Sequence, residues 1–362
     1  MCSEMKHNVG SDNFVTIGLM SGTSLDGVDI AACRFFPTSG SWGYEILHAE
    51  TYPYTAEWRD ELSHLETASA LTLTSIHTQY GKYLGILVRE FILNKGINAN
   101  LVASHGHTIF HQPGNGFTLQ IGHGAAIAAE CNIPVVSDFR SLDVALGGQG
   151  APLVPIGDKL LFGHYSQCLN LGGFCNISYE IDGVREAFDI APCNIVLNHY
   201  SEYLNIPFDK DGLIAAQGQI SEPLLEALSA LPYYSLGTPK SLGKEWVLRE
   251  FLPVVDCYEI SISDKLRTVS EHIAIQISKV VNKAPSGNIL VTGGGALNQF
   301  LVTRIENLSN FRIVIPDAET INFKEALNFA FLGFLRFQGK INVLKSVTGS
   351  KRDHSGGSIF LP

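Results

Sequence analysis

The sequence predicts an α/β protein with two domains. Strand-like and helical patterns alternate along the chain, which is typical of layered α/β domains. At 362 residues the chain exceeds the size at which one hydrophobic core usually keeps growing. Both halves begin with the same predicted plan, three short strands with glycines in the first turn, followed by helices and further strands. We therefore expect two domains of similar design.

The first half begins with a predicted meander of three strands. A short apolar run over 14–20 leads into the polar turn SGTSLDG, and the run VDIAACRFF resumes extended structure. In 73–94, apolar residues recur at the spacing of one helix face. The predicted elements are strands over 14–20, 28–36, 44–51, 101–104 and 134–137, and helices over 55–67, 73–94 and 125–131.

The glycine-rich stretch DVALGGQGAP, residues 143–152, marks the predicted crossing into the second half. A second meander follows, with Asp182-Gly183 as a hairpin signal. The predicted elements are strands over 167–171, 176–180, 184–190, 288–292 and 312–315, and helices over 195–204, 266–281, 297–308 and 324–337.

The composition excludes several classes of protein. With 45% hydrophobic and 17% charged residues, the chain is neither disordered nor a coiled coil. A net charge of −10 argues against nucleic acid or an anionic membrane as the main partner, because both require clustered Lys and Arg. The seven cysteines include no CxxC pair, and the sequence shows neither a signal peptide nor an apolar run long enough for a membrane span. We expect a soluble, cytoplasmic protein with reduced thiols.

Three glycine-bearing turns have the composition of phosphate-binding sites. The run SGTSLDGVD, residues 21–29, combines glycines and hydroxyls with Asp26 and Asp29, so its N–H groups could bind an anion and its carboxylates hydrated Mg²⁺. An ordinary polar hairpin is the alternative. The turn LNLGG at 169–173 is comparable, and VTGGGALN at 291–298 lies between a predicted strand and a helix, where phosphate can approach the backbone. Taken alone, the third turn is better explained by tight strand-to-helix packing.

Histidines and acids supply the other candidates. His105, His107 and His111 lie within seven residues, a density that suggests zinc. No HEXXH helix and no nearby carboxylate completes a ligand set, so a hydrogen-bonding loop is the favoured interpretation. Asp189 stands at the end of a predicted strand, where a carboxylate can accept a proton from a hydroxyl or water.

Taken together, the motifs resemble those of the anhydro-N-acetylmuramic acid kinases of bacterial cell-wall recycling. The similar runs follow the family's order over nearly the whole chain. They are MSGTSLDGVD at 20–29, SHGHTIFH at 104–111, TLQIG at 118–122, DFRSLDVALGGQGAPLVP at 138–155, LNLGGFCNIS at 169–178, PKSLGKE at 239–245, VTGGGALN at 291–298 and SVTGS at 346–350.

The resemblance implies two ribonuclease H-like domains of the actin/hexokinase type, with ATP and a sugar bound in a cleft between them. We expect an N-terminal domain over 1–142, completed by 339–362, and a C-terminal domain over 143–338. The implied enzyme is an ATP- and Mg²⁺-dependent carbohydrate kinase. It opens 1,6-anhydro-N-acetylmuramic acid with water as it phosphorylates O6, and so produces N-acetylmuramic acid 6-phosphate for peptidoglycan recycling. We also expect a homodimer.

The resemblance also implies roles for residues. The ATP phosphate loop would comprise Gly22, Thr23, Ser24, Asp26, Gly27 and Asp29, with Asp26 toward Mg²⁺. Further nucleotide contacts would come from Gly172 and Gly173, and from Gly293, Gly294 and Gly295 on the adenosine side. Asp189 falls on the general base. The expected substrate-binding residues are His105, Arg140, Asp143 and Glu325, with Arg140 toward the lactyl carboxylate.

One departure from the family lies beside the base. Many members read FDTGPGN, whereas this chain reads FDIAPCN, so Ala191 and Cys193 replace glycines. We expect the added Cβ atoms to narrow the site. Alternative functions are a kinase for another amino sugar, a nucleotide-dependent conformational protein like actin or a chaperone ATPase, and a zinc hydrolase built on the histidines.

Overall fold

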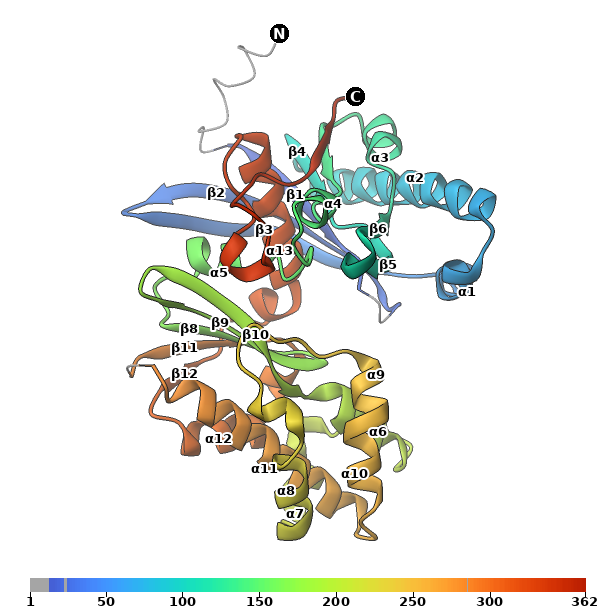
Figure 1. Ribbon diagram of the computed structural model, residues 1–362. Helices are drawn as coiled ribbons and strands as arrows, with labels where there is room; N and C mark the ends of the chain where they lie inside the picture. The colour runs from blue at the N-terminus through green and yellow to red at the C-terminus, as the bar shows by residue number, and fades with distance from the viewer. Residues whose placement is uncertain (1–12, 23–24, 285) are drawn as a thin grey trace. The chain divides into compact units, whose positions relative to one another are not determined.

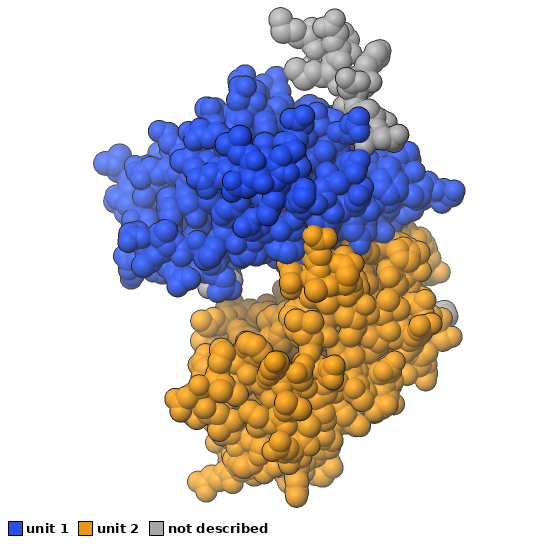
Figure 2. Space-filling model, turned by 180° about the vertical axis from the view of Figure 1, so that it is seen from behind, with its two compact units in different colours: residues 1–161, 323–362 blue, residues 162–322 orange. Residues whose placement is uncertain are grey.

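The computed structural model describes residues 13–22, 25–284 and 286–362. It divides into two compact units (Figure 2). Unit 1 comprises Met1–Leu161 and Phe323–Pro362, and unit 2 comprises Phe162–Asn322.

Unit 1 is built on a six-stranded mixed sheet in the order β13-β7-β4-β1-β2-β3 (Figure 1). The meander β1-β2-β3 is antiparallel, whereas β1, β4 and β7 run parallel. A separate hairpin pairs β5 with β6. The strands are β1 (Val15–Met20), β2 (Gly27–Thr38), β3 (Ser41–Pro53), β4 (Leu101–Ser104), β5 (His107–Gln112), β6 (Phe117–Ile121), β7 (Val135–Ser137) and β13 (Ser358–Phe360).

Helices cover both faces of this sheet. On one face, α2 packs Tyr80, Leu84 and Phe91 into a core with Ile17 and Leu19 of β1. Strand residues alternate between faces, so Gly18 points to the opposite side, where α13 packs. A Cβ on Gly18 would lie 1.9 Å from the carbonyl oxygen of Ala326, so only glycine permits this approach. The helices of unit 1 are α1 (Ala56–His64), η2 (Leu65–Thr67), α2 (Ala70–Lys95), η3 (Pro113–Asn115), α3 (Gly124–Cys131), α4 (Ser141–Ala145), α5 (Pro155–Leu161), α14 (Lys345–Thr348) and most of α13 (Ala318–Phe337).

Unit 2 repeats the strand plan of unit 1. Its five-stranded sheet has the order β10-β9-β8-β11-β12, with an antiparallel meander β8-β9-β10 and parallel pairs β8-β11 and β11-β12. A first strand flanked by its meander on one side and by parallel strands on the other is the ribonuclease H-like topology, so the predicted fold is confirmed in both units. The strands are β8 (Gln167–Leu171), β9 (Phe174–Ile181), β10 (Val184–Pro192), β11 (Asn288–Thr292) and β12 (Arg312–Val314).

The core of unit 2 is formed largely by α11. Leu266, Val269, Ile273 and Ile277 recur at three- and four-residue spacing on this helix and are completely buried. The helices are α6 (Asn194–Glu202), η4 (Lys210–Gly212), α7 (Leu213–Gln217), α8 (Glu222–Ser229), η5 (Pro232–Ser235), α9 (Lys244–Trp246), η6 (Val247–Phe251), α10 (Leu252–Asp256), α11 (Ile262–Val281), η7 (Gly294–Leu297) and α12 (Gln299–Leu308). Within the described residues, no helix combines the length and apolar character that a membrane span requires.

The units divide at other positions than those expected from the sequence. The glycine-rich stretch 143–152 and the helix α5 belong to unit 1. The Gln149 N–H donates to the Thr348 carbonyl at 2.8 Å, and Lys324 of α13 pairs with the buried Asp158 of α5 at 2.9 Å. The second division lies before Phe323 rather than after residue 338, since α13 packs on β1 from there on.

Candidate active site

The predicted phosphate turn after β1 rests on a buried polar network. Ser21 Oγ lies 3.0 Å from His107 Nδ1 and also contacts the phenol oxygen of Tyr54, which in turn contacts that of Tyr80. All four residues are buried, and burial lowers the pKa of His107 to about 4. The His107 ring is therefore neutral near pH 7 and can form one hydrogen bond with Ser21. This contact fixes the position of Ser21, the first residue of the turn.

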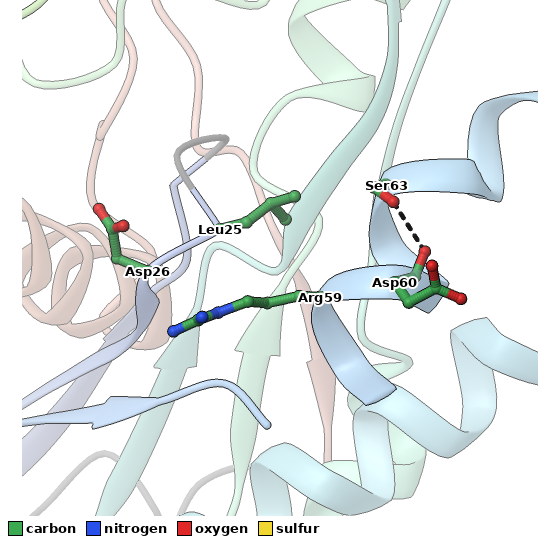
Figure 3. Close-up of a pocket in the computed structure, with 5 residues that line it drawn as sticks. All are labelled: Leu25, Asp26, Arg59, Asp60 and Ser63. Atoms are coloured by element: carbon green, nitrogen blue, oxygen red, sulfur yellow. Dashed lines mark hydrogen bonds between the residues drawn. The ribbon is translucent and has the colours of Figure 1, made fainter. Parts of the chain in front are cut away.

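The described part of the turn presents one exposed carboxylate. Asp26 lines a surface pocket to which helix α1 contributes the facing side (Figure 3); the lining residues are Leu25, Asp26, Arg59, Asp60 and Ser63. Gly27 has a packing role, because a Cβ there would lie 2.3 Å from the Tyr52 carbonyl oxygen of β3. Gly22 is half-buried at the start of the turn, while the predicted residues Thr23 and Ser24 lie outside the described residues.

Two more carboxylates of unit 1 interact electrostatically with this turn. Asp29 Oδ1 accepts a hydrogen bond from Thr51 at 2.6 Å, yet burial raises the pKa of Asp29 and the charge of Asp26 adds to the rise. Desolvation also raises the pKa of Glu325, and Asp29 contributes further, against the opposing charge of Arg140. The charge of Asp26 therefore influences Asp29, and the charges of Asp29 and Arg140 influence Glu325.

Arg140 is held by two acceptors and keeps free donors. Its Nε and Nη2 donate to His105 Nε2 at 3.2 and 2.9 Å, and Nη1 donates to the Gly150 carbonyl at 2.6 Å. A guanidinium has five N–H bonds, and in the described part of the chain two of them have no acceptor, so they can bind a ligand. Burial lowers the pKa of Arg140 to about 10, which leaves it charged near neutral pH.

His105 is a neutral acceptor in this arrangement. Its Nδ1 donates to the Gly106 carbonyl at 2.9 Å, so Nε2 carries the lone pair that Arg140 contacts. Burial, and then the charge of Arg140, holds the pKa of His105 well below its usual range. His105 therefore orients Arg140, a role that the sequence did not distinguish from direct substrate contact.

Asp143 differs from its expected role. The side chain is 0% exposed, Oδ2 accepts the Gly150 N–H at 2.7 Å and Oδ1 accepts the Thr348 hydroxyl at 2.7 Å. A carboxylate so enclosed has no surface to offer a substrate in this structure. The expected substrate contact is therefore not supported, and Asp143 acts as an internal anchor.

The three clustered histidines belong to separate networks. His107 contacts Ser21 and His105 contacts Arg140, whereas His111 Nδ1 lies 3.1 Å from Thr118 Oγ1. Across 13–22, 25–284 and 286–362, no group of three His, Cys, Asp or Glu side chains is arranged to hold a metal ion.

In unit 2, two glycine turns meet where the parallel strands β8 and β11 end. A Cβ on Gly293, whose φ is +82°, would lie 2.6 Å from Asn170 Oδ1, and one on Gly295 would lie 2.7 Å from Leu171 Cβ. These two glycines are required by packing. At Gly173 and Gly294 a Cβ would have no neighbour closer than 4.0 and 3.8 Å, so a ligand can approach the backbone there.

The first of these turns also caps helix α6. The Gly172 carbonyl accepts the N–H of Asn194, and the Gly173 carbonyl accepts those of Cys193 and Ile195 at 2.8 and 3.2 Å. The amide of Asn194 donates to the Leu171 carbonyl at 3.0 Å. Strand end, glycine turn and helix start therefore form one rigid assembly.

Asp189 lies on β10 and is held by the PKSLGKE segment. Its backbone N–H donates to the Lys240 carbonyl, and its Oδ2 accepts the Leu242 N–H at 2.8 Å. Tyr233 donates to the Asp189 carbonyl at 2.7 Å. Within the described residues Oδ1 has no hydrogen-bond partner. Burial raises the pKa of Asp189, and the Leu242 hydrogen bond opposes the rise. One oxygen is thus fixed and the other is available to a ligand.

The residues that replace glycines near Asp189 do not narrow this site. Ala191 and Cys193 are 0% exposed and belong to the apolar core of unit 2 with Leu171 and Val196. Cys193 neighbours Cys175, whose pKa is raised by burial and by that contact. The expectation of a narrowed pocket is wrong, because both Cβ atoms point into the core.

Comparison with known proteins identifies the family. A sequence model described as anhydro-N-acetylmuramic acid kinase matches residues 14–362. The chain belongs to the anhydro-N-acetylmuramic acid kinase family. It is 34% identical over 366 residues to the anhydro-N-acetylmuramic acid kinase of Vibrio vulnificus strain YJ016, covering 95% of this chain and 97% of that protein. It is 36% identical over 366 residues to the kinase of that name from Shewanella frigidimarina strain NCIMB 400, with the same coverage. Among solved structures, component A of the (R)-2-hydroxyglutaryl-CoA dehydratase of Acidaminococcus fermentans is similar at a TM-score of 0.47 and 11% identity, covering 90% of this chain and 99% of that chain.

Sequence reasoning missed several residues of this family member. Tyr54 and Tyr80 lie in no recognisable motif, and their contacts with Ser21 of the 20–29 motif are visible only in the structure. The motifs PKSLGKE and SVTGS belong to the family resemblance without an assigned role, yet they contact Asp189 and Asp143 respectively. The signal that could have found these contacts was the presence of both motifs among the runs that resemble the family.

Proposed function

We propose that the chain opens 1,6-anhydro-N-acetylmuramic acid with water and phosphorylates O6 with ATP, producing N-acetylmuramic acid 6-phosphate for peptidoglycan recycling. The observation that carries the proposal is Asp189. It lies within β10 (Val184–Pro192) at a bulge rather than at the predicted strand end, with one oxygen fixed by the Leu242 N–H and the other without a hydrogen-bond partner among the described residues, in a member of this kinase family.

Asp189 supplies the base on the water side. Its free Oδ1 accepts a proton from water as the water attacks the anomeric carbon, where positive charge develops as the bond to O6 breaks. The departing O6 takes the γ-phosphoryl group of ATP, which balances its developing negative charge. Attack and phosphoryl transfer are thus coupled without a covalent enzyme intermediate.

Unit 1 supplies the sugar contacts that the proposal requires. The two free N–H bonds of Arg140 suit the lactyl carboxylate, because a guanidinium binds a carboxylate through paired hydrogen bonds. Glu325 is the proposed partner of a sugar hydroxyl, because the residue is exposed although the surrounding protein raises the pKa of its carboxyl. We assign the ATP phosphates to the 22–29 turn and to the open faces of Gly173 and Gly294.

The carboxylates of the phosphate turn fit a magnesium ion that binds together with ATP. Mg²⁺ prefers hard oxygen ligands and usually needs only one or two protein carboxylates beside phosphates and water. Asp26 is exposed and interacts electrostatically with Asp29, so the two are the proposed ligands. The ion would neutralise charge on the transferring phosphoryl group.

A coupled assay of ADP release across a small sugar panel tests the function. With 1,6-anhydro-N-acetylmuramic acid, ATP and Mg²⁺, we expect one ADP per sugar consumed and a product whose mass equals the sugar plus water plus a phosphoryl group. Turnover of N-acetylglucosamine or N-acetylmannosamine but not of the anhydro sugar would replace the proposed substrate. ADP release without any sugar product would instead favour a nucleotide-dependent conformational protein.

We also propose a cytoplasmic location and a homodimeric state. Sedimentation velocity of the purified chain would test the second, and a monomer at micromolar concentration would contradict it.

A further inference from the structure

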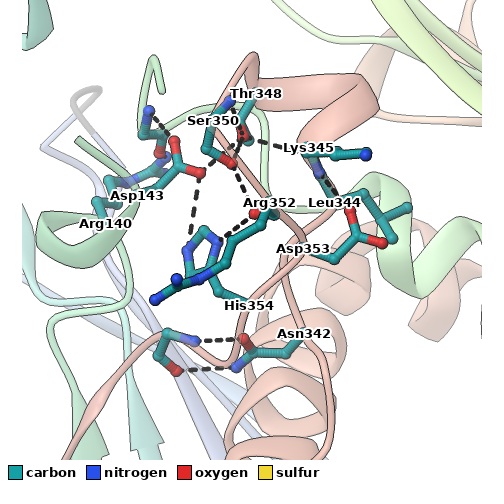
Figure 4. Close-up of polar contacts among 12 residues, drawn as sticks. Arg140, Asp143, Asn342, Leu344, Lys345, Thr348, Ser350, Arg352, Asp353 and His354 are labelled. Atoms are coloured by element: carbon teal, nitrogen blue, oxygen red, sulfur yellow. Dashed lines mark hydrogen bonds and ion pairs between the residues drawn. The ribbon is translucent and has the colours of Figure 1, made fainter. Parts of the chain in front are cut away.

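The C-terminal motif SVTGS, residues 346–350, has no part in the proposed chemistry, yet one of its side chains is deeply buried in unit 1. Thr348 is 1% exposed and ends the short helix α14. Its hydroxyl lies 2.7 Å from Asp143 Oδ1, across 205 positions of sequence (Figure 4). Its carbonyl also accepts the Gln149 N–H at 2.8 Å. The end of the chain is therefore joined to the glycine-rich stretch by both side chain and backbone.

Asp143 transmits this contact to Gly150. Its Oδ2 accepts the Gly150 N–H at 2.7 Å, while the Gly150 carbonyl accepts Arg140 Nη1 at 2.6 Å. Arg140 and Asp143 lie three residues apart at the start of α4, so one short segment holds Gly150 by both its donor and its acceptor.

Glycines are required for this geometry. Gly150 has a φ of +68°, where a side chain is strained, and a Cβ on Gly148 would lie 2.2 Å from Asp143 Oδ2. The absence of a side chain at Gly148 makes room for the carboxylate of Asp143. That carboxylate holds Gly150 where the Gly150 carbonyl accepts a hydrogen bond from Arg140.

We propose that Thr348 and Asp143 are positioning residues that hold Arg140, through Gly150, in the orientation that binds the carboxylate of the sugar. The assignment rests on the proposed function, because it needs a sugar with a carboxylate. It gives the SVTGS motif a role in substrate affinity, with no contact between Thr348 and the substrate.

The physical reason is the burial of the Asp143 charge. Without the Thr348 hydroxyl, Oδ1 loses its hydrogen bond of 2.7 Å, while His354 Nε2 lies beyond hydrogen-bond distance at 3.7 Å. A buried carboxylate shifts toward whatever donors remain, since an unsatisfied charge is costly. Movement of Asp143 displaces Gly150 and rotates Arg140 about its contact with His105.

Steady-state kinetics of hydroxyl-deleting variants test the assignment. Thr348→Val should raise the KM of the anhydro sugar about tenfold, the scale of a lost hydrogen bond to a charged group, and should leave the KM of ATP within about twofold. Thr348→Ser keeps the hydroxyl and should restore the sugar KM. Thr268→Val is the matched control, because Thr268 is equally buried in unit 2 and donates to the Asp264 carbonyl at 2.7 Å. It should leave the sugar KM unchanged.

A double-mutant cycle separates positioning from general destabilisation. In an Arg140→Ala background, Thr348→Val should have no further effect on the sugar KM, because the residue through which it acts is absent. Additive effects of the two substitutions, or an unchanged sugar KM in Thr348→Val, would overturn the positioning role. The proposed function would still stand in that case, provided that the wild-type protein turns over the anhydro sugar. A wild-type protein that turns over no anhydro sugar would overturn the proposed function and this assignment with it.

Discussion

At the scale of single residues, the chemistry of the site depends on which atoms of a side chain are already bound. Asp189 and Asp143 are both carboxylates near strand or helix ends, yet Asp189 keeps one free oxygen whereas both oxygens of Asp143 accept hydrogen bonds. Arg140 likewise keeps two of its five N–H bonds. Only a side chain with an unused donor or acceptor atom can form a hydrogen bond with a substrate. The number of unused atoms therefore separates side chains that can react from those that hold the structure in place.

Asp189→Asn should slow the chemical step by roughly 100-fold or more, which is the scale of positioned general-base catalysis. The amide keeps the shape of the side chain but cannot take the proton of water. Sugar and ATP should bind with near-normal affinity, because their proposed contacts lie elsewhere. Single-turnover kinetics with both ligands saturating would measure the step, and near-normal product formation would place the base at another residue.

Asp26→Ala should reduce phosphorylation at least about tenfold and raise the Mg²⁺ concentration needed for half-maximal rate, because a proposed ligand of the ion is lost. The fold should persist, since Asp26 is exposed. Asp60→Ala on the facing side of the same pocket is the matched control. Mg²⁺ titrations that coincide for wild type and Asp26→Ala would contradict the assignment.

At the scale of elements, segments that are distant in sequence complete the site. The PKSLGKE segment lies beside β10 and supplies the N–H that fixes Asp189. Ser21, after β1, contacts His107, the first residue of β5, and Tyr54, which in turn contacts Tyr80 of α2. Asp189 and the turn after β1 are therefore each supported by residues distant in sequence, and of these only Tyr54 and Tyr80 lie outside the quoted motifs.

Leu242→Pro should lower kcat about 10- to 100-fold, because proline has no N–H to donate and hydrogen bonds to charged groups are worth about 1.5–3 kcal/mol. The acid limb of the pH–rate profile should also move to higher pH. The base works when ionised, burial already raises its pKa, and loss of the Leu242 donor removes the contact that opposes this rise. Leu242→Ala retains the N–H and controls for the side chain; equal losses in both variants would count against the backbone role.

His107→Gln should reduce the loss of folding stability that occurs as the pH falls from about 6.5 to about 4. The folded-state pKa of His107 is about 4 and its ordinary value is 6.5, so the unfolded chain binds an extra proton between these values and stability falls as the pH falls through that window. The wild type should lose up to about 3 kcal/mol there through this residue, at about 1.4 kcal/mol per pKa unit. Glutamine can still contact Ser21 and does not titrate. Urea unfolding at pH 7 and pH 4.5 checks the difference, and parallel losses in both proteins would refute it.

At the scale of the whole molecule, one strand plan occurs twice and the proposed nucleotide contacts are divided between the copies. The 22–29 turn belongs to unit 1, whereas Gly173 and Gly294 belong to unit 2. One nucleotide can contact both sets only when the two units bring them together, so binding and relative movement of the units should be coupled.

Small-angle scattering should show a smaller radius of gyration when a nonhydrolysable ATP analogue and the anhydro sugar are both saturating. The sugar alone, or the analogue with the Asp26→Ala variant, should produce a smaller change. An unchanged radius with both ligands bound, as verified by calorimetry, would contradict closure.

Much of the fold was predictable because it depends on local patterns. Strands β4, β8 and β11 were predicted with their observed bounds, 101–104, 167–171 and 288–292, since short apolar runs between polar turns read clearly as buried strands. The β5-β6 hairpin was missed although Phe117–Ile121 of β6 alternates apolar and polar residues, so a local signal was present. The three-residue β13 was missed because it is short and pairs with the distant β7. The compact units divide at other positions than the predicted bounds, and a buried ion pair such as that between Lys324 and Asp158 leaves no local mark in the sequence.

By itself the sequence determined the doubled α/β plan and the glycine turns, because each depends on residue type at a given spacing; Asp189 as the proposed base came from the resemblance to the family. Only the tertiary structure decided that Asp143 is enclosed, that Ala191 and Cys193 face the core, and that Leu242 and Thr348 support Asp189 and Asp143. Those facts concern the direction in which a side chain points and the distant group it meets. Such contacts arise from packing between elements, which residue type and spacing along one chain do not encode.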